Sequence, residues 1–313
     1  MTTPRILRRS NLQPRASALV ALLLALGVFS YVSLGEGVPA TAKASYDLLT
    51  GLIESQFPAA TAALPDRYVL VAPPSESAAN VRDFYIPLAR YLSNATGKLI
   101  VYEQPPNWRA YHDGILRDSF DLAFDNPQFV SWRIANKDHK ALARIASPAV
   151  FVVLARRSDR RVRSIDDLVA RPVCGQARFD SGTLSLFSRF ERPARRPVLI
   201  STGDWQSAYE TLISGGCDGA VVPLALYKGL GADRALTRVL LKSSATPGQT
   251  LTAGPRLSAE DKVKITQALM SPAGQKLAKP LCQRFDATGL VEARGQDYAG
   301  LSSMLRNTWG FDI

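Results

Sequence analysis

The sequence predicts an α/β protein with two lobes, and three observations support this prediction. Residues 122–124 form a short apolar run, typical of a buried parallel strand, which stops before a new helical pattern begins at Pro127. About a hundred residues later, a strand pattern at 218–222 leads in the same way into a helix that begins at Pro223. The chain has 313 residues, of which 46% are apolar, so it is long enough for two domains of ordinary size. Any two strand–helix units look alike, however, and the repetition is equally compatible with unrelated units.

The first of these units predicts a ligand site. Asn126 is placed to cap the new helix, and Pro127 is suited to its first position. Exposed backbone N–H groups at such a helix start point into the crevice beyond the strand ends, where open α/β sheets bind ligands.

The remaining elements extend the two predicted lobes. We expect residues 67–150 together with 248–313 to form lobe 1, and residues 151–247 to form lobe 2. In lobe 1, a strand at 68–72, a helix at 81–95 and a strand at 99–102 make the basic unit of a parallel sheet. The β-branched run at 149–155 is expected to cross to lobe 2, and the chain is expected to return near 251–253.

The N-terminus predicts export. Basic residues up to Arg15 precede an uncharged apolar segment at 16–34, and the small residues Ala42 and Ala44, on either side of Lys43, suit signal peptidase. The apolar segment is about as long as a bilayer core is thick. Residues 1–44 are therefore either a cleaved signal peptide or an uncleaved anchor, and 45–66 are a spacer. The protein would be periplasmic, released or tethered to the inner membrane.

The net charge of +11 does not predict a nucleic-acid partner. Part of this charge lies in residues 1–44, and much of the rest lies in two arginine runs at 156–163 and 189–196. Neither run has the interleaved aromatic residues or the fold motif of a nucleic-acid surface. We expect both runs to be solvated.

Three cysteines in an oxidising compartment allow one disulfide. Cys174 and Cys217 both fall on or beside predicted strands of lobe 2, which makes them the candidate pair, with Cys282 left over. Three buried thiols are an equally weighted alternative, because the sequence does not show their geometry.

Several short strings, in this order and spacing, resemble the phosphate/phosphonate-type substrate-binding proteins of ABC transporters. These strings are PLARYL at 87–92, TG at 96–97, DLAF at 121–124, SIDDL at 164–168, DSGT at 180–183, CDGA at 217–220 and PGQ at 247–249. The likeness covers residues 67 to about 290. It implies the type 2 periplasmic binding protein fold, in which two lobes, each a mainly parallel sheet flanked by helices, are joined by two hinge crossings. It also implies a small-molecule ligand of the oxyanion type and an ABC permease partner in the inner membrane, and we expect a monomer.

The resemblance and the helix starts together predict a set of ligand-binding residues. Trp108 takes the place of an aromatic residue that the family uses, and the turn at 179–183 takes the place of its oxyanion cradle. Asp180 would repel an anion in that cradle, while Gln249 and Asp204 stand where the family has other polar residues. The full predicted set is Ser75, Trp108, Asp125, Asn126, Phe129, Phe179, Asp180, Ser181, Gly182, Thr183, Asp204, Tyr227 and Gln249.

Two other functions are weighed against an ABC-type solute-binding protein. An enzyme is disfavoured because the chain has only two histidines, no Gly-x-Ser-x-Gly elbow and no P-loop, so we expect no catalytic residue, cofactor or bound metal. The alternative is a membrane-anchored sensor or accessory protein that uses the same fold for a cationic or metal-containing ligand. Asp125, Asp180 and Asp204 could form a carboxylate cluster for such a ligand, although capping and turn roles are favoured for them.

Overall fold

The computed structural model describes residues 66–74, 76–306 and 311. The chain divides into two units, 1–64 and 65–313, and all of the described residues belong to the second. The predicted signal peptide or anchor, the spacer up to residue 65, and Ser75 lie outside the described residues. Among the described residues, no helix combines the length and the apolar composition needed to cross a membrane.

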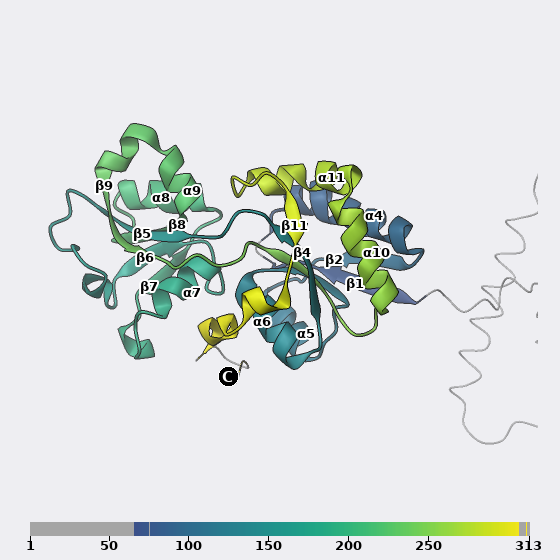
Figure 1. The fold of residues 1–313 in the computed structure, drawn as a ribbon. Helices are drawn as coiled ribbons and strands as arrows, with labels where there is room; N and C mark the ends of the chain where they lie inside the picture. Colours follow the sequence, from purple (N-terminus) through teal and green to yellow (C-terminus); the bar gives the residue numbers. More distant parts are fainter. Residues whose placement is uncertain (1–65, 75, 307–310, 312–313) are drawn as a thin grey trace, which may run out of the picture. The chain divides into compact units, whose positions relative to one another are not determined.

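Lobe 1 contains a six-stranded sheet with the strand order β11-β4-β10-β3-β1-β2 (Figure 1). Its strands are β1 (Arg67–Val71), β2 (Leu99–Glu103), β3 (Leu122–Asp125), β4 (Lys140–Ile145), β10 (Thr250–Ala253) and β11 (Leu290–Glu292). Its helices include α3 (Ala78–Asn80), η1 (Val81–Tyr85), α4 (Ile86–Thr96), α5 (Trp108–Leu116), α6 (Pro127–Asn136), α10 (Ala259–Met270) and α11 (Pro272–Gln283). Two short 3-10 segments follow, η5 (Gly295–Tyr298) and η6 (Leu301–Leu305).

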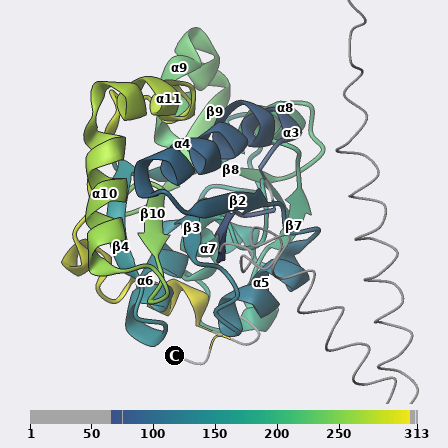
Figure 2. The same ribbon diagram turned by 90° about the vertical axis from the view of Figure 1, so that its right-hand side faces the viewer.

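Both faces of this sheet are covered by helices. Along β3, Leu122 and Phe124 pack with residues of α4, α10 and α11, whereas Ala123 packs with residues of α5 and α6 on the other face. Figure 2 shows α4 and α11 above the strands and α5 and α6 below them. Because alternate residues of a strand point to opposite faces, a strand covered on both sides has to be apolar throughout, as 122–124 is.

Lobe 2 contains a five-stranded sheet with the strand order β7-β6-β8-β5-β9. Its strands are β5 (Phe151–Arg156), β6 (Pro172–Gly175), β7 (Val198–Ser201), β8 (Gly219–Pro223) and β9 (Thr237–Lys242). Its helical elements are α7 (Ser181–Phe187), α8 (Trp205–Ile213) and α9 (Leu224–Gly229), with the 3-10 segments η2 (Asp166–Leu168), η3 (Pro193–Arg195) and η4 (Gly231–Leu236). One core layer lies under α7 and another lies under α8.

The two-sheet architecture confirms the predicted fold class, with one refinement. In each sheet three strands pair parallel, β2-β1-β3 and β7-β6-β8, but the strand that arrives from the other lobe, β10 or β5, is antiparallel to its neighbours. The physical reason is the direction of entry. A strand that enters from the edge where the parallel strands end must run opposite to them, so both sheets are mixed.

The two crossings between the lobes run beside each other. Backbone hydrogen bonds in both directions join Ala149 to Thr246, at 2.9 and 3.0 Å. A Cβ atom on Gly248 would lie only 2.8 Å from the carbonyl oxygen of Ile145 and 2.9 Å from that of Ser147. Glycine at 248 therefore permits the close approach of the second crossing to the first.

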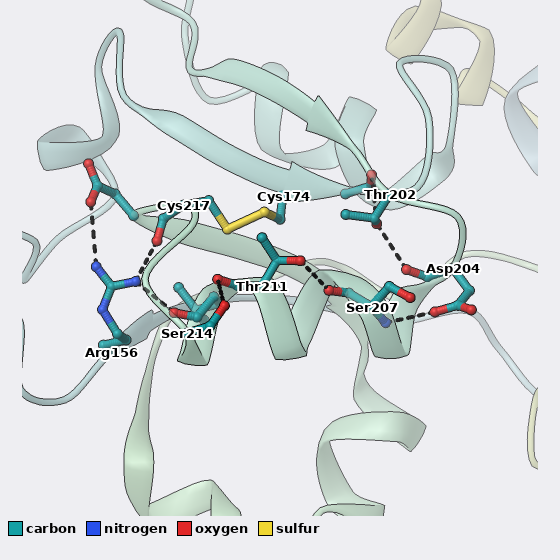
Figure 3. The surroundings of a disulfide bond; sticks show 11 residues. Arg156, Cys174, Thr202, Asp204, Ser207, Thr211, Ser214 and Cys217 are labelled. Atoms are coloured by element: carbon teal, nitrogen blue, oxygen red, sulfur yellow. Dashed lines mark hydrogen bonds and ion pairs between the residues drawn. A yellow bond between two sulfur atoms is a disulfide. The ribbon is translucent and has the colours of Figure 1, made fainter.

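Cys174 and Cys217 form a disulfide in lobe 2, which is the pair that the sequence suggests (Figure 3). Their Cα atoms are 6.0 Å apart, within the range that disulfides require. Cys282 is a buried free thiol. The disulfide ties β6 to the segment that leads into β8, and it packs against α8 in the core of lobe 2.

Candidate functional site

A cavity of about 220 Å³ lies between the two sheets. Lobe 1 contributes the start of α6, and lobe 2 contributes the starts of α7, α8 and α9, each of which follows a strand. Both crossings and the segment after α11 complete the lining, through residues such as Ser147, Gly248 and Phe285. This is the position in which open α/β sheets bind ligands.

At the start of α6, the side chain of the capping residue Asn126 contacts the second crossing instead of its own helix. Asn126 is the N-cap, but its side chain makes no capping hydrogen bond to the helix. Instead, its Oδ1 accepts a hydrogen bond from Nε2 of Gln249 on the second crossing, at 3.2 Å. The Oε1 atom of Gln249 is buried and has no hydrogen-bond partner among the described residues. The cavity therefore has a polar wall with an unused acceptor.

The start of α7 differs, because a carboxyl group satisfies its own helix. Asp180 is the N-cap, and its side chain accepts a hydrogen bond from the backbone N–H of Gly182 at 2.9 Å. Burial raises the pKa of this carboxyl from 3.8 to about 6, against the lowering effect of the backbone N–H groups. A Cβ atom on Gly182 would lie 2.5 Å from the ring of Phe151, so glycine allows α7 to pack closely on β5.

Direct contacts join the two lobes beside the cavity. The Nε2 group of Gln128 on α6 donates to the carbonyl oxygen of Phe179, and Ser181 Oγ on α7 donates to Gln128 Oε1, both at 2.9 Å. The ring of Trp108 lies 5.1 Å from the ring of Phe179 and 6.3 Å from that of Phe129, measured between centroids. The helix starts of the two lobes are therefore fastened to each other in this structure.

Charged and aromatic groups line the rest of the cavity. Glu76 pairs with Arg284 at 3.1 Å, whereas Lys228 on α9 forms no ion pair with any described residue. Trp205 contacts Phe285 with ring centroids 5.9 Å apart, and its Nε1 atom is buried without a hydrogen-bond partner among the described residues. Lys228 and Trp205 Nε1 are thus unused donors at the cavity, while Asp180 and Asp286 supply carboxylates.

Four of the residues predicted from the sequence line the cavity, namely Asn126, Asp180, Ser181 and Gln249. Trp108, Phe129 and Phe179 instead form an aromatic cluster beside it. Gly182 and Thr183 are buried in the first turn of α7. Tyr227 is partly buried and packs against the lobe 2 core, with the Arg234 guanidinium 6.0 Å from its ring.

The three aspartates proposed as a carboxylate cluster have separate roles. Asp125 is fully buried and pairs with Arg133 at 3.0 Å, and the hydroxyl of Tyr111 donates to it. Asp180 caps α7, and Asp204 caps α8 by accepting from the backbone N–H of Ser207 at 2.7 Å. No group of three or more His, Cys, Asp or Glu residues that could hold a metal ion exists among the described residues. Asp180 and Asp204 therefore have the capping roles that the sequence favoured for them.

Sequence reasoning missed Glu76, Trp205, Lys228, Arg284, Phe285 and Asp286 as cavity residues. For some of them a signal was present. Glu76 lies just after the end of β1, and Trp205 and Lys228 lie on helices that follow lobe 2 strands. Residues 284–286 follow α11 and are distant in sequence from every turn between a parallel strand and its helix. The sequence around them contains no signal that they reach the cavity.

Solved structures share this fold. A binding protein component of an ABC phosphonate transporter from Pseudomonas aeruginosa is 15% identical, with a TM-score of 0.56 over 75% of this chain and 84% of that one. A Xanthomonas citri protein bound to ATP is 12% identical, with a TM-score of 0.59 over 77% and 97%. PhnD1 from Prochlorococcus marinus in complex with methylphosphonate is 12% identical, with a TM-score of 0.60 over 78% and 98%. At these identities the likeness establishes the fold.

A comparison with curated protein sequences found no match. The sequence pattern of one family, described as "ABC transporter, phosphonate, periplasmic substrate-binding protein", matches residues 70–298. That stretch includes both sheets apart from the first three residues of β1, as well as every described residue that lines the cavity. The chain therefore belongs to the family of periplasmic substrate-binding proteins of phosphonate ABC transporters.

Proposed function

We propose that this protein binds a small phosphonate- or phosphate-like oxyanion in the cavity between its sheets and delivers it to an ABC permease in the inner membrane. The observation that carries the proposal is the convergence of helix starts from both lobes on one cavity, with the unpaired Lys228 and the Trp205 N–H beside them. Helix N-termini attract anions through their free N–H groups and their dipoles. The complex of PhnD1 with methylphosphonate supports the ligand class by family likeness.

The contacts between the lobes suggest how capture is signalled. Gln128 joins the start of α6 to the start of α7 through Phe179 and Ser181, next to the cavity. A ligand that contacts both helix starts would stabilise this joined arrangement relative to an open one. Hinge closure around a ligand is the common motion of two-lobed binding proteins. The permease would then recognise the closed form.

Asp180 restricts the ligand. An ionised carboxylate about 4 Å from an oxyanion opposes binding by roughly 1 kcal/mol in water and by several times more in a partly dry cleft. Because the pKa of Asp180 is raised to about 6, protonating its carboxylate near neutral pH requires little free energy. A protonated carboxyl group is a hydrogen-bond donor. The protein would therefore bind an oxyanion together with a proton.

We further propose that the protein acts as a monomer, binds its ligand without converting it, and is exported through residues 1–44. Mass spectrometry of the mature N-terminus tests how it is held. A start near Ser45 indicates a released protein, whereas retention of residues 16–34 indicates a membrane tether. Incubation with methylphosphonate followed by phosphorus NMR tests catalysis, and the expected spectrum is unchanged.

Ser181 provides the sharpest test of the ligand site. Ser181→Pro removes the backbone N–H and the hydroxyl at the first position of α7, where proline fits the helix. Ser181→Ala removes only the hydroxyl that donates to Gln128. A ligand at a hundredfold over its dissociation constant adds about 2.7 kcal/mol of stability. We expect methylphosphonate to raise the unfolding temperature of the wild-type protein and of Ser181→Ala, but not that of Ser181→Pro. Equal shifts in all three proteins would show that the start of α7 does not contact the ligand.

A further inference from the structure

A second cavity of about 390 Å³ lies on the outer side of α7, against the C-terminal segment η6. It shares no lining residue with the cavity between the sheets. Three arginines line it: Arg178 precedes α7, Arg196 follows η3, and Arg306 follows η6. The only acidic residue in its lining is Glu191, so the cavity carries an excess of positive charge.

The three arginines form no ion pair in the described part of the chain, although Glu191 lines the same cavity. By contrast, the arginines at 156, 161 and 171 all pair with Asp159 or Asp218. The Nε atom of Arg196 is buried without a hydrogen-bond partner among the described residues. Burial and the charge of Arg178 both lower the pKa of Arg196. The cavity therefore holds like charges close together with a buried donor unused.

The wall holds one of these guanidinium groups, that of Arg196, in place. The guanidinium carbon of Arg196 lies 5.5 Å from the centroid of the Phe187 ring, a cation–π contact that restricts the side chain. Leu184 and Met304 form an apolar floor between α7 and η6. Guanidinium groups bind phosphate oxygens through paired, charge-assisted hydrogen bonds, and a positioned arginine loses less entropy on binding.

We propose that this cavity is a second anion site, which binds a phosphate-bearing ligand with at least two negative charges. Because η6 packs against both α6 and α7, an anion held by Arg178, Arg196 and Arg306 would fasten the C-terminal segment to lobe 2. This second site is separate from the cavity between the sheets, so the proposal does not depend on which solute that cavity binds.

Calorimetric titration of the full-length protein, purified in mild detergent, with sodium pyrophosphate tests the site. The double variant Arg178→Gln/Arg196→Gln removes two groups that donate charge-assisted hydrogen bonds to the anion, so we expect it to bind pyrophosphate at least tenfold more weakly. The matched control is Arg189→Gln/Arg192→Gln, which removes two exposed charges from the same run outside the cavity lining. It should bind pyrophosphate within twofold of the wild type.

Arg306→Gln provides a variant at an exposed position outside the lobe 2 core, and it should also weaken binding about tenfold. Circular dichroism verifies that each variant is folded. Equal losses of pyrophosphate affinity in the test and control double variants would show that the anion is attracted to basic surface in general. Unchanged affinity in the test variants, or no binding by the wild-type protein, would show that this cavity binds no anion. Each of these results overturns the proposal.

A parallel experiment distinguishes a free phosphate from a lipid headgroup. Co-sedimentation with phosphatidylcholine vesicles that contain phosphatidic acid, compared between wild type and Arg178→Gln/Arg196→Gln, shows whether the cavity takes a membrane phosphate. A difference between the two proteins assigns the site to the headgroup. Pyrophosphate binding without such a difference assigns it to a soluble phosphate ester.

Discussion

Two buried carboxyl groups, Asp125 and Asp180, stand at the edges of the two sheets that face the cavity, and they differ in their partners. Asp125 ends β3 and is held by Arg133 and by the hydroxyl of Tyr111, all three fully buried. Asp180 begins α7, is 7% exposed, and accepts from backbone N–H groups without any cationic partner. One carboxyl group is neutralised by a fixed charge, and the other is not.

The difference indicates distinct roles for the two positions. Burial raises the pKa of Asp125, and the Arg133 guanidinium and the Tyr111 hydroxyl oppose that rise. Burial lowers the pKa of Arg133, but the Asp125 carboxylate raises it more, and the ion pair anchors α6 to β3. Burial raises the pKa of Asp180 to about 6, and this residue lines the cavity. Lobe 1 thus places a helix start with a paired carboxyl group beside the cavity, and lobe 2 places one whose carboxyl group has no cationic partner.

Breaking the pair in lobe 1 should have the largest effect. Arg133→Met leaves the carboxylate of Asp125 buried without a counter-charge, which typically costs about 3 to 5 kcal/mol of stability. Urea unfolding followed by circular dichroism measures this loss. The double variant Asp125→Asn/Arg133→Met removes both charges and should recover part of it. If Arg133→Met lost less than about 1 kcal/mol, the buried pair would not be the anchor that we infer.

Removing the unpaired carboxyl group of Asp180 in lobe 2 should instead increase the free energy of unfolding. Because the pKa of Asp180 is raised from 3.8 to about 6, the folded protein holds a proton that the unfolded chain releases between these values. Its contribution to stability is greatest below pH 4 and is lost as the pH rises through 6. Asp180→Asn keeps a good N-cap and cannot ionise, so it should stabilise the protein by about 2 to 3 kcal/mol at pH 8 relative to wild type, and little at pH 4.

Unfolding free energies measured at pH 4, 6 and 8 for both proteins give this comparison directly. A variant that destabilises the protein equally at all three pH values would contradict a buried, titrating Asp180. A constant gain would indicate better packing rather than charge.

The smallest effect should appear in ligand affinity. Ionised Asp180 repels an oxyanion, so methylphosphonate should bind the wild-type protein about tenfold more weakly at pH 8 than at pH 5, equivalent to about 1.4 kcal/mol. Titration calorimetry at both values measures the difference. Asp180→Asn should not show this change, and it also serves as the control for ionisation of the ligand itself. If the affinity for methylphosphonate depended on pH identically in the two proteins, Asp180 would not contribute to ligand specificity.

Much of the fold could be predicted because its signals are local. Pro127 with Asn126, and Asp180 before a run of small residues, mark helix starts through capping and backbone chemistry that needs no distant partner. The apolar run at 122–124 implied burial on both faces, and β3 is buried throughout. The antiparallel direction of β5 and β10 was not predicted, because an apolar strand pattern does not encode its pairing partner.

The cavity was predictable only in part. Asn126, Asp180, Ser181 and Gln249 lie at helix starts or in the crossing, where the sequence placed the site. Trp108, Phe129 and Phe179 were also predicted, but they lie beside the cavity, where Trp108 contacts both phenylalanine rings. The aromatic residues Trp205 and Phe285 line the cavity, and their contact joins residues eighty positions apart in the chain.

The sequence by itself determined where the strands and helices of the two lobes begin, the family, and which two cysteines could pair, because each depends on short-range patterns or on the order of motifs. Only the tertiary structure decided that Asp125 has a cationic partner and Asp180 has none, that residues 284–286 reach the cavity, and that three arginines gather beside η6. Those features depend on which distant segments pack together, and packing sets burial and the separation between charges. Local pattern does not contain that information.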